Sequence, residues 1–302
     1  MNLVSFVDRI NEVDNFCRML GNASKPIMLV WGESEIGKTH LMRKLMHVCE
    51  TRKLVKVFFE WTGFRGYDYV EIMREIRDNL GRKHFPKFNR LDNSKKSDPA
   101  AIIEMVDKGR STVGAGANIS GTVGRMANTI IERQTVILGD QLGAELTRMK
   151  KSRMVRLTDA FIVELAKATK RNPIIVFFDP LEKIDPETQL WMWGELFKAV
   201  AEGRLPNVKF VACGQPQPQF ASSYLDAVET PELKPFARED IIEYLKIRFR
   251  LAEVAVADEN FEVMAISILS SPYDTACYPG KVFETAFKLI ELYRQRSTQN
   301  DG

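Results

Sequence analysis

Two kinds of hydrophobic pattern alternate along this chain. Short, continuous apolar runs predict strands at residues 27–31, 54–60, 173–179, 208–213 and 228–236. Apolar residues spaced three and four apart predict helices, among them 41–49, 67–80, 187–201 and 238–250. Runs that are apolar throughout suit parallel strands covered on both faces. The pattern therefore predicts an α/β fold with a central, mostly parallel sheet between two layers of helices.

The last part of the chain shows only helical periodicity. Helices are predicted at residues 238–250, 259–269 and 281–295. We expect a core domain over residues 1–235 and a small helical lid over residues 236–302.

A polar and glycine-rich segment, residues 82–147, interrupts the core pattern. Residues 82–96 carry six Lys/Arg against one Asp and predict a loop or a small hairpin. Such a run is a candidate contact for a phosphate backbone, although a solvated loop is the plainer interpretation. Residues 109–124 hold five glycines and predict a flexible connector or a glycine-rich hairpin. A second basic cluster, residues 148–156, precedes a helix predicted to begin at Leu157, with Thr158 or Asp159 as its cap.

One motif links the first predicted strand to the next helix. Residues Gly32-Glu33-Ser34-Glu35-Ile36-Gly37-Lys38-Thr39 read G-x-x-x-x-G-K-T, the pattern of a phosphate-binding P-loop. The two glycines let the backbone turn its N–H groups onto phosphates. Lys38 is expected to reach the β- and γ-phosphates and to act in catalysis, and the Thr39 hydroxyl is expected to ligate Mg²⁺. We extend the predicted nucleotide-binding set to His40.

The strand at residues 173–179 ends in a carboxylate, Asp179. Ligands of open α/β sheets bind at the carboxyl ends of the strands. An apolar strand followed by Asp is a Walker-B pattern, so Asp179 is predicted to hold Mg²⁺ together with Thr39.

Composition narrows the class of protein but does not choose a function. The 302 residues carry a net charge of only +3, which does not by itself predict a nucleic-acid partner. The four cysteines lie far apart without C-x-x-C spacing, so neither a disulfide framework nor a zinc site is expected. No signal-peptide pattern and no apolar run of about 20 residues is present, so we predict a cytoplasmic protein without a membrane partner.

Together with the P-loop, the opening Phe-Val-Asp-Arg-Ile-Asn-Glu of residues 6–12 resembles the start of STAND-type and AAA-like P-loop NTPases. The resemblance implies a three-layer P-loop NTPase core with a helical lid. It also implies that Val7 lines the adenine pocket and that Arg9 lies near the nucleotide. The alternative is that Asp8 caps a surface helix and Arg9 lies in water.

Two further segments resemble STAND NTPases. Asp179-Pro180-Leu181-Glu182 is similar to the STAND pattern Asp-x-Leu-(Asp/Glu), which implies Glu182 as the general base or water-orienting group, with Asp185 in reserve. Glu182 could instead pair with Lys183 or cap the next helix. Gln215 stands at the position of the sensor-1 residue, where it can hydrogen-bond a γ-phosphate, or it is a turn residue before a proline.

The resemblance implies an ATPase with ATP and Mg²⁺ as cofactors. We expect slow hydrolysis and a nucleotide-dependent molecular switch in signalling or prokaryotic defence. Its expected partner is another protein or a second copy of the chain. The alternative is a DNA-associated AAA+ ATPase of the origin-recognition or transposition-helper type, which the two basic clusters support.

Overall fold

The computed structural model describes residues 9–21, 25–62, 66–94, 148–215, 226–271 and 277–300. Val7 and the glycine-rich residues 109–124 lie outside these ranges. The chain divides into two compact units, one formed by Met1–Leu80 with Ala168–Gly302 and the other by Gly81–Lys167. Each unit is considered by itself.

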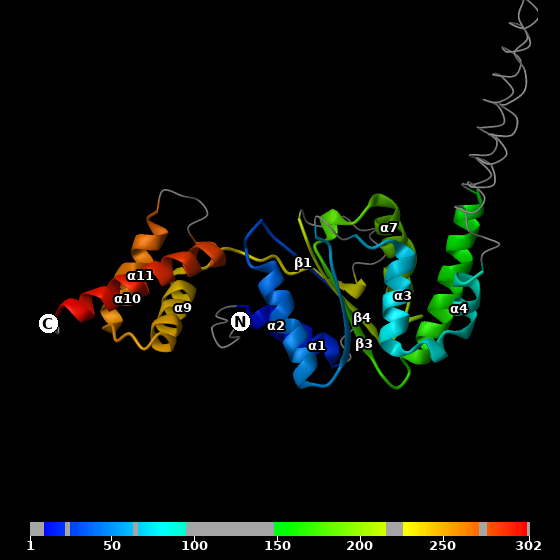
Figure 1. Ribbon diagram of the computed structural model, residues 1–302, viewed down its shortest axis with the longest axis horizontal. Coiled ribbons are helices and arrows are strands. Elements are labelled where there is room, and N and C mark those ends of the chain that lie inside the picture. The colour runs from blue at the N-terminus through cyan, green and yellow to red at the C-terminus, as the bar shows by residue number, and fades with distance from the viewer. Residues whose placement is uncertain are drawn as a thin grey trace, which may run out of the picture. The chain divides into compact units, whose positions relative to one another are not determined.

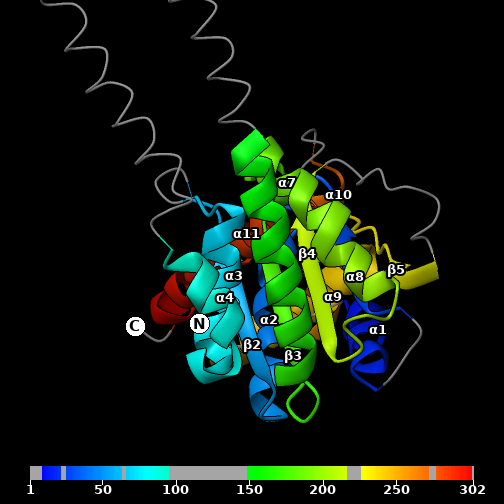
Figure 2. The ribbon, with the colours of Figure 1, turned by 90° about the vertical axis from the view of Figure 1, so that its right-hand side faces the viewer.

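The first unit is built on a five-stranded sheet with the order β2-β3-β4-β1-β5 (Figures 1 and 2). All of its strand pairs are parallel, as predicted. The strands are β1 (Ile27–Trp31), β2 (Val55–Glu60), β3 (Ile174–Asp179), β4 (Val208–Gly214) and β5 (Val228–Glu229). The order places β4 between the strand that precedes the P-loop and the strand that ends in Asp179.

The fifth strand is shorter than the predicted run of residues 228–236. Only Val228 and Glu229 pair regularly with β1, and Glu232 adds an isolated bridge to Trp31. Pro231 has no N–H to donate to a ladder, which explains the interruption.

Helices cover both faces of the sheet, which confirms the three-layer prediction. On one face lie α1 (Ile10–Leu20) and α2 (Lys38–Thr51), and on the other lie α3 (Tyr69–Leu80) and the continuous run α7 (Pro186–Trp191), η5 (Met192–Phe197) and α8 (Lys198–Ala201). Neighbouring side chains of β3 point to opposite faces. Phe177 meets Phe16 of α1 at a ring distance of 6.1 Å, and Phe178 meets Phe197 of η5 at 6.0 Å.

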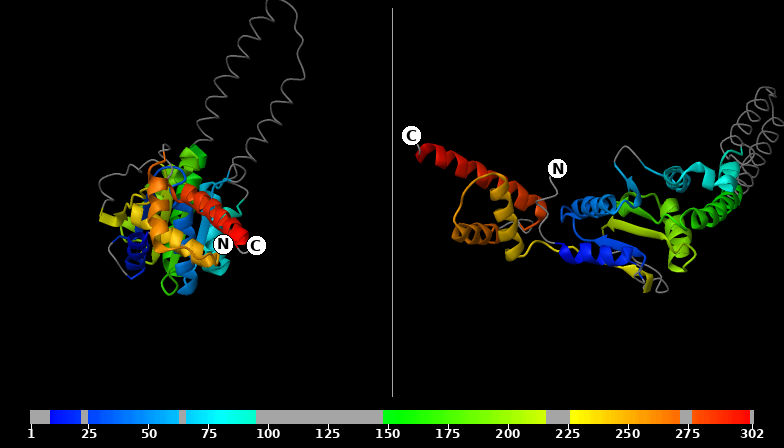
Figure 3. Two further views of the ribbon diagram at one scale, coloured as in Figure 1. Left: turned by 90° about the vertical axis from the view of Figure 1, so that its left-hand side faces the viewer. Right: turned by 90° about the horizontal axis from the view of Figure 1, so that it is seen from below.

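The three predicted C-terminal helices are also present. They are α9 (Arg238–Leu251), α10 (Asp258–Leu269) and α11 (Pro279–Asn300), coloured gold to red in Figure 3. They bury a hydrophobic cluster of their own, in which Phe249 contacts Phe261 and Tyr293 edge to face. The buried cluster of these three helices is therefore distinct from that of the sheet.

In the second unit, the predicted loop or hairpin at residues 82–96 is wrong. Its described part forms a short 3₁₀ turn, η2 (Arg82–His84), and the helix α4 (Pro86–Asp92). Pro86 occupies the first helical position, where its missing N–H costs nothing. Phe85 and Phe88 are fully buried, so two apolar positions within a basic run fix the helix.

The predicted helix start at Leu157 is also wrong. The helix already runs from residue 148 to residue 168, and Thr158 is buried in its middle instead of capping it. Arg, Lys and Met are good helix formers, so a basic segment without apolar periodicity can still be helical.

Candidate functional site

The loop between β1 and α2 has the backbone that its two glycines predict. Gly32 has φ 153°, and a Cβ at this position would lie 2.9 Å from the Leu233 carbonyl oxygen. Gly37 has φ 96° and precedes the first residue of α2. No acidic residue lies in the first turn of α2, and no side chain caps its N-terminus. The free N–H groups and the positive end of the helix dipole therefore suit an anion.

Lys38 is folded over this loop. Its side chain is buried, and Nζ donates to the carbonyl oxygens of Gly32 at 2.7 Å and Glu33 at 2.6 Å. With the Gln215 amide turned so that its oxygen faces Lys38, this oxygen accepts from Nζ at 3.2 Å and from the Ser34 N–H at 2.8 Å. Burial lowers the pKa of Lys38 below its usual value, and the nearby carboxylate of Glu182 counters this.

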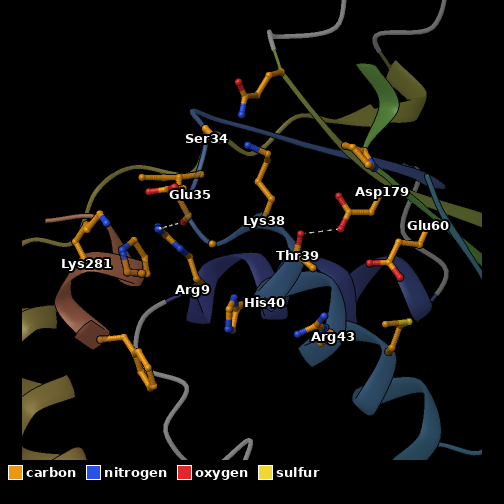
Figure 4. Close-up of a pocket in the computed structure, with 18 of the residues that line it drawn as sticks. Arg9, Ser34, Glu35, Lys38, Thr39, His40, Arg43, Glu60, Asp179 and Lys281 are labelled. Atoms are coloured by element: carbon orange, nitrogen blue, oxygen red, sulfur yellow. Dashed lines mark hydrogen bonds between the residues drawn. The ribbon is translucent and has the colours of Figure 1, made fainter. Parts of the chain in front are cut away.

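The side chains of Thr39 and Asp179 are hydrogen-bonded to each other. The Thr39 hydroxyl donates to Asp179 Oδ2 at 2.8 Å, although 140 residues separate the two in sequence (Figure 4). Asp179 is 4 % exposed at the end of β3. Burial raises the pKa of its carboxyl, and the charge of Glu60 acts in the same direction. The hydrogen bond from Thr39 partly offsets this increase.

These oxygen donors fit a magnesium ion. Mg²⁺ binds hydroxyl and carboxylate oxygens and completes its shell with water and phosphate oxygens. A cation here would offset the unfavourable burial of the Asp179 charge. Within the described ranges, no three His, Cys, Asp or Glu residues cluster as a metal site. A divalent ion at Thr39 and Asp179 would therefore need ligands from the nucleotide, as P-loop sites do.

Glu182 and Asp185 have different structural roles. Glu182 lies in the 3₁₀ turn η4 (Leu181–Lys183), directly after the cis peptide between Asp179 and Pro180. Its Oε2 accepts from the Gln215 N–H at 3.0 Å. Asp185 caps α7 by accepting from the Thr188 N–H at 2.9 Å. The alternative in which Glu182 caps the next helix is therefore wrong. The cap is Asp185, which the sequence offered as the second candidate for the general base.

Arg9 does not lie in water. Its side chain is buried and donates to the carbonyl oxygens of Lys234, at 2.6 Å, and Ile36, at 3.4 Å. Its guanidinium carbon lies 5.8 Å from the ring centre of Phe236. Arg9 thus connects the P-loop to the segment that leads into α9.

A cavity of about 1270 Å³ contains most of the predicted residues. Its lining includes Arg9, Ser34, Glu35, Ile36, Gly37, Lys38, Thr39, His40, Asp179, Glu182 and Gln215. Gly32 and Glu33 do not line it, but their carbonyl oxygens hold Lys38.

The sequence patterns missed several residues of this cavity. Glu60 lies beside Asp179 in Figure 4, and the two are register partners on β2 and β3. A charged residue at the carboxyl end of a predicted strand was the signal that could have identified Glu60. The helices after residue 236 contribute Tyr244, Arg248 and Lys281. No local pattern marks Tyr244 and Arg248, because only the folded chain brings them to the P-loop. Lys281 follows Tyr278-Pro279-Gly280 at the position of a sensor-2 motif, where the sequence left it either near the phosphates or solvated.

The parallel sheet and the glycine loop between β1 and α2 have the arrangement of a P-loop NTPase fold. The strand order and the loop geometry carry this fold assignment. No protein-family model and no curated protein matches the sequence.

Several solved structures are similar at low identity. The Walker-type ATPase PABY2304 of Pyrococcus abyssi is 16 % identical, with 97 % of this chain and 77 % of that chain covered and a TM-score of 0.42. Domain III of the replication initiation protein DnaA from Thermotoga maritima is 10 % identical. The match covers 99 % of this chain and 90 % of that chain, with a TM-score of 0.43.

The STAND protein PH0952 of Pyrococcus horikoshii, which has a tetratricopeptide repeat sensor, is 14 % identical, with a TM-score of 0.46. The match covers 94 % of this chain and 32 % of that protein, so the chain spans about a third of its length.

None of the described helices combines the length and the apolar character that crossing a bilayer requires.

Proposed function

We propose that this chain is an ATPase that binds ATP with Mg²⁺ in the cavity at the P-loop and hydrolyses it slowly. The observation that carries the proposal is the hydrogen bond from Thr39 to Asp179 beside the P-loop. This bond brings the two predicted magnesium ligands to one point, next to the lysine expected to hold the phosphates. The cytoplasmic location stays a prediction.

Each group has a distinct role in the proposal. The N–H groups of the loop and the Lys38 ammonium hold the phosphates, and Thr39 and Asp179 hold the metal. The metal neutralises negative charge on the phosphate oxygens. Glu182 orients the attacking water and accepts its proton. Its Oε2 accepts a hydrogen bond from the backbone N–H of Gln215, which holds the carboxylate beside the P-loop.

The same cavity supports a nucleotide-dependent switch. Its lining combines residues of the proposed core, 1–235, with Tyr244, Arg248 and Lys281 of the proposed lid, 236–302. A ligand that contacts both parts favours the arrangement in which both can reach it. We propose that this arrangement exposes a surface for a protein partner or a second copy of the chain, in signalling or prokaryotic defence. The alternative, a DNA-associated ATPase, uses the same nucleotide site and differs in its partner.

Calorimetric titration with ATP, in Mg²⁺ and in EDTA, tests the site. Lys38→Ala should abolish measurable binding, because it removes the cation that faces the phosphates. Lys198→Ala is the matched control, since Lys198 lies on the surface and pairs only loosely with Glu202 at 3.9 Å. Unchanged binding by Lys38→Ala would contradict the site.

Size measurement with ATP and with a slowly hydrolysed analogue then tests the switch, which predicts a nucleotide-dependent change in mass or hydrodynamic radius.

A further inference from the structure

The second unit joins two basic segments that lie far apart in the sequence. Phe85 and Phe88 of the first segment pack against Phe161 of the helix at residues 148–168, at ring distances of 5.8 and 5.6 Å. Glu164 of that helix accepts from the backbone N–H groups of Lys87 and Phe88, at 2.8 and 3.0 Å. In Figures 1 and 2, α4 runs beside the helix. The two basic clusters of the sequence are therefore parts of one structural element.

This element concentrates positive charge. Residues 81–94 and 148–167 carry ten Lys/Arg and three Asp/Glu, a net charge of +7, whereas the whole chain carries only +3. One of the three acids, Glu164, is buried, and its carboxylate accepts hydrogen bonds from the N-terminus of α4. The mild charge of the full chain thus conceals a strongly basic region.

Nearly all of these cations are exposed. The exposed ones are Arg82, Lys83, Lys87, Arg90, Arg148, Lys150, Lys151, Arg156 and Lys167. Residues 148–156 place like charges three positions apart, at 148 and 151, 150 and 153, and 153 and 156. Such pairs repel each other on a helix surface, so an anionic partner would stabilise this segment.

We propose that this basic surface, formed by residues 82–90 and 148–167, binds the phosphate backbone of double-stranded nucleic acid without sequence specificity. Contacts of Lys and Arg with phosphates position a duplex but do not read its bases. A helix over residues 148–168 is about 30 Å long. That is close to one turn of a B-form duplex, about 34 Å.

The apolar residues of the element argue for a duplex over other polyanions. Its described aromatic residues, Phe85, Phe88 and Phe161, are all buried. No described aromatic ring is thus offered for stacking on single-stranded bases. The exposed apolar residues of the helix are Met149, Val155 and Val163, which are scattered along it. They do not form the continuous apolar face with which an interfacial helix enters a membrane.

The proposal does not depend on the ATP site. The surface belongs to the second compact unit, whereas every residue that lines the cavity belongs to the first. Lys38→Ala should therefore bind a duplex as the unmodified chain does, so failure of one proposal leaves the other open to its own test.

Fluorescence anisotropy with a labelled duplex of about 30 base pairs, over salt concentrations of about 50 to 300 mM, tests the surface. The logarithm of the binding constant should fall linearly with the logarithm of the salt concentration. The triple variant Arg148→Gln, Lys150→Gln, Lys151→Gln should weaken binding at least tenfold at low salt. It should also make the slope shallower by about two to three, since each lost phosphate contact removes about 0.9.

A second triple variant, Lys83→Gln, Lys87→Gln, Arg90→Gln, tests the other segment independently and should also weaken binding. The matched control is Lys25→Gln, Lys198→Gln, Arg204→Gln, which removes the same charge from side chains that are each 44 % exposed. Circular dichroism confirms that each variant is folded. Equal weakening in the control overturns the proposal, as does binding to phosphatidylserine vesicles or polyglutamate without binding to the duplex.

Discussion

Glu60 and Asp179 are register partners at the carboxyl ends of the neighbouring parallel strands β2 and β3. The charge of Glu60 raises the pKa of Asp179, and Glu182 acts in the same direction from the following turn. Of these three carboxylates beside the P-loop, only that of Asp179 is buried, whereas Glu60 and Glu182 are exposed. Their contacts differ, because Asp179 accepts the Thr39 hydroxyl and Glu182 accepts the Gln215 backbone N–H, while Glu60 ends the neighbouring strand β2.

The first prediction concerns the base. Glu182→Gln should slow ATP hydrolysis by about 10² to 10⁴, the usual contribution of a positioned general base. ATP affinity should stay within about threefold, because in the proposal Glu182 contacts water and not the phosphates. Single-turnover hydrolysis and calorimetry measure the two effects.

Glu60→Gln is the matched control for this prediction, since it makes the same chemical change at the register partner of Asp179 on β2. Its hydrolysis rate should stay within about tenfold of the unmodified chain. A large loss in Glu60→Gln with none in Glu182→Gln would assign the base to the end of β2.

The second prediction concerns the backbone of the P-loop. Gly32→Ala should lower the free energy of unfolding by about 2 kcal/mol and abolish ATP binding, because the new methyl group would lie 2.9 Å from the Leu233 oxygen at a strained φ. Gly194→Ala, in the helical run after β3, meets nothing within 4 Å. It should leave stability unchanged or raise it by up to about 1 kcal/mol. Urea denaturation compares the two, and equal stability would contradict the close approach.

The third prediction concerns Arg9. Arg9→Ala should destabilise the chain by about 2 kcal/mol and lower Tm by several degrees, because the carbonyl oxygens of Ile36 and Lys234 lose a buried donor. Arg18→Ala should change stability by less than about 0.5 kcal/mol, since among the described residues its side chain hydrogen-bonds only to that of Asn15, in an exposed pair. Thermal denaturation measures both. Equal shifts would show that the Arg9 contacts contribute nothing specific.

The fourth prediction concerns alkaline pH. Tyr244 is buried, which raises the pKa of its phenol to about 12. Between pH about 10 and 12 the unfolded chain releases this proton while the folded chain keeps it, so the contribution of Tyr244 to stability falls as pH rises. The loss should be at most about 2 to 3 kcal/mol.

Tyr244→Phe isolates this contribution. Its unfolding free energy should fall less steeply from pH 9 to pH 12 than that of the unmodified chain. The difference between the two curves is the informative quantity, because the half-buried Lys209, whose pKa is lowered by burial, acts in the opposite direction. Parallel curves would show that the phenol titrates normally.

Sequence patterns predicted the strands and helices well where apolar residues were dense. The run Ile174–Asp179 is buried at every position, and its apolar content alone indicated a central strand. Prediction failed at α4, where two buried phenylalanines stand among basic residues. Their partner, Phe161, lies more than seventy positions away, so local periodicity could not reveal the contact.

The sequence by itself determined the phosphate-binding loop, because the requirements of that loop are met by eight consecutive residues, Gly32 to Thr39. Only the tertiary structure decided what surrounds it. Asp179 reaches Thr39 across 140 positions, and Arg9 reaches the Lys234 carbonyl across 225. Strand order in a parallel sheet sets the first of these distances, since it brings the carboxyl ends of β1, β4 and β3 to one edge whatever their separation along the chain. Short-range patterns of polarity hold no information about that order.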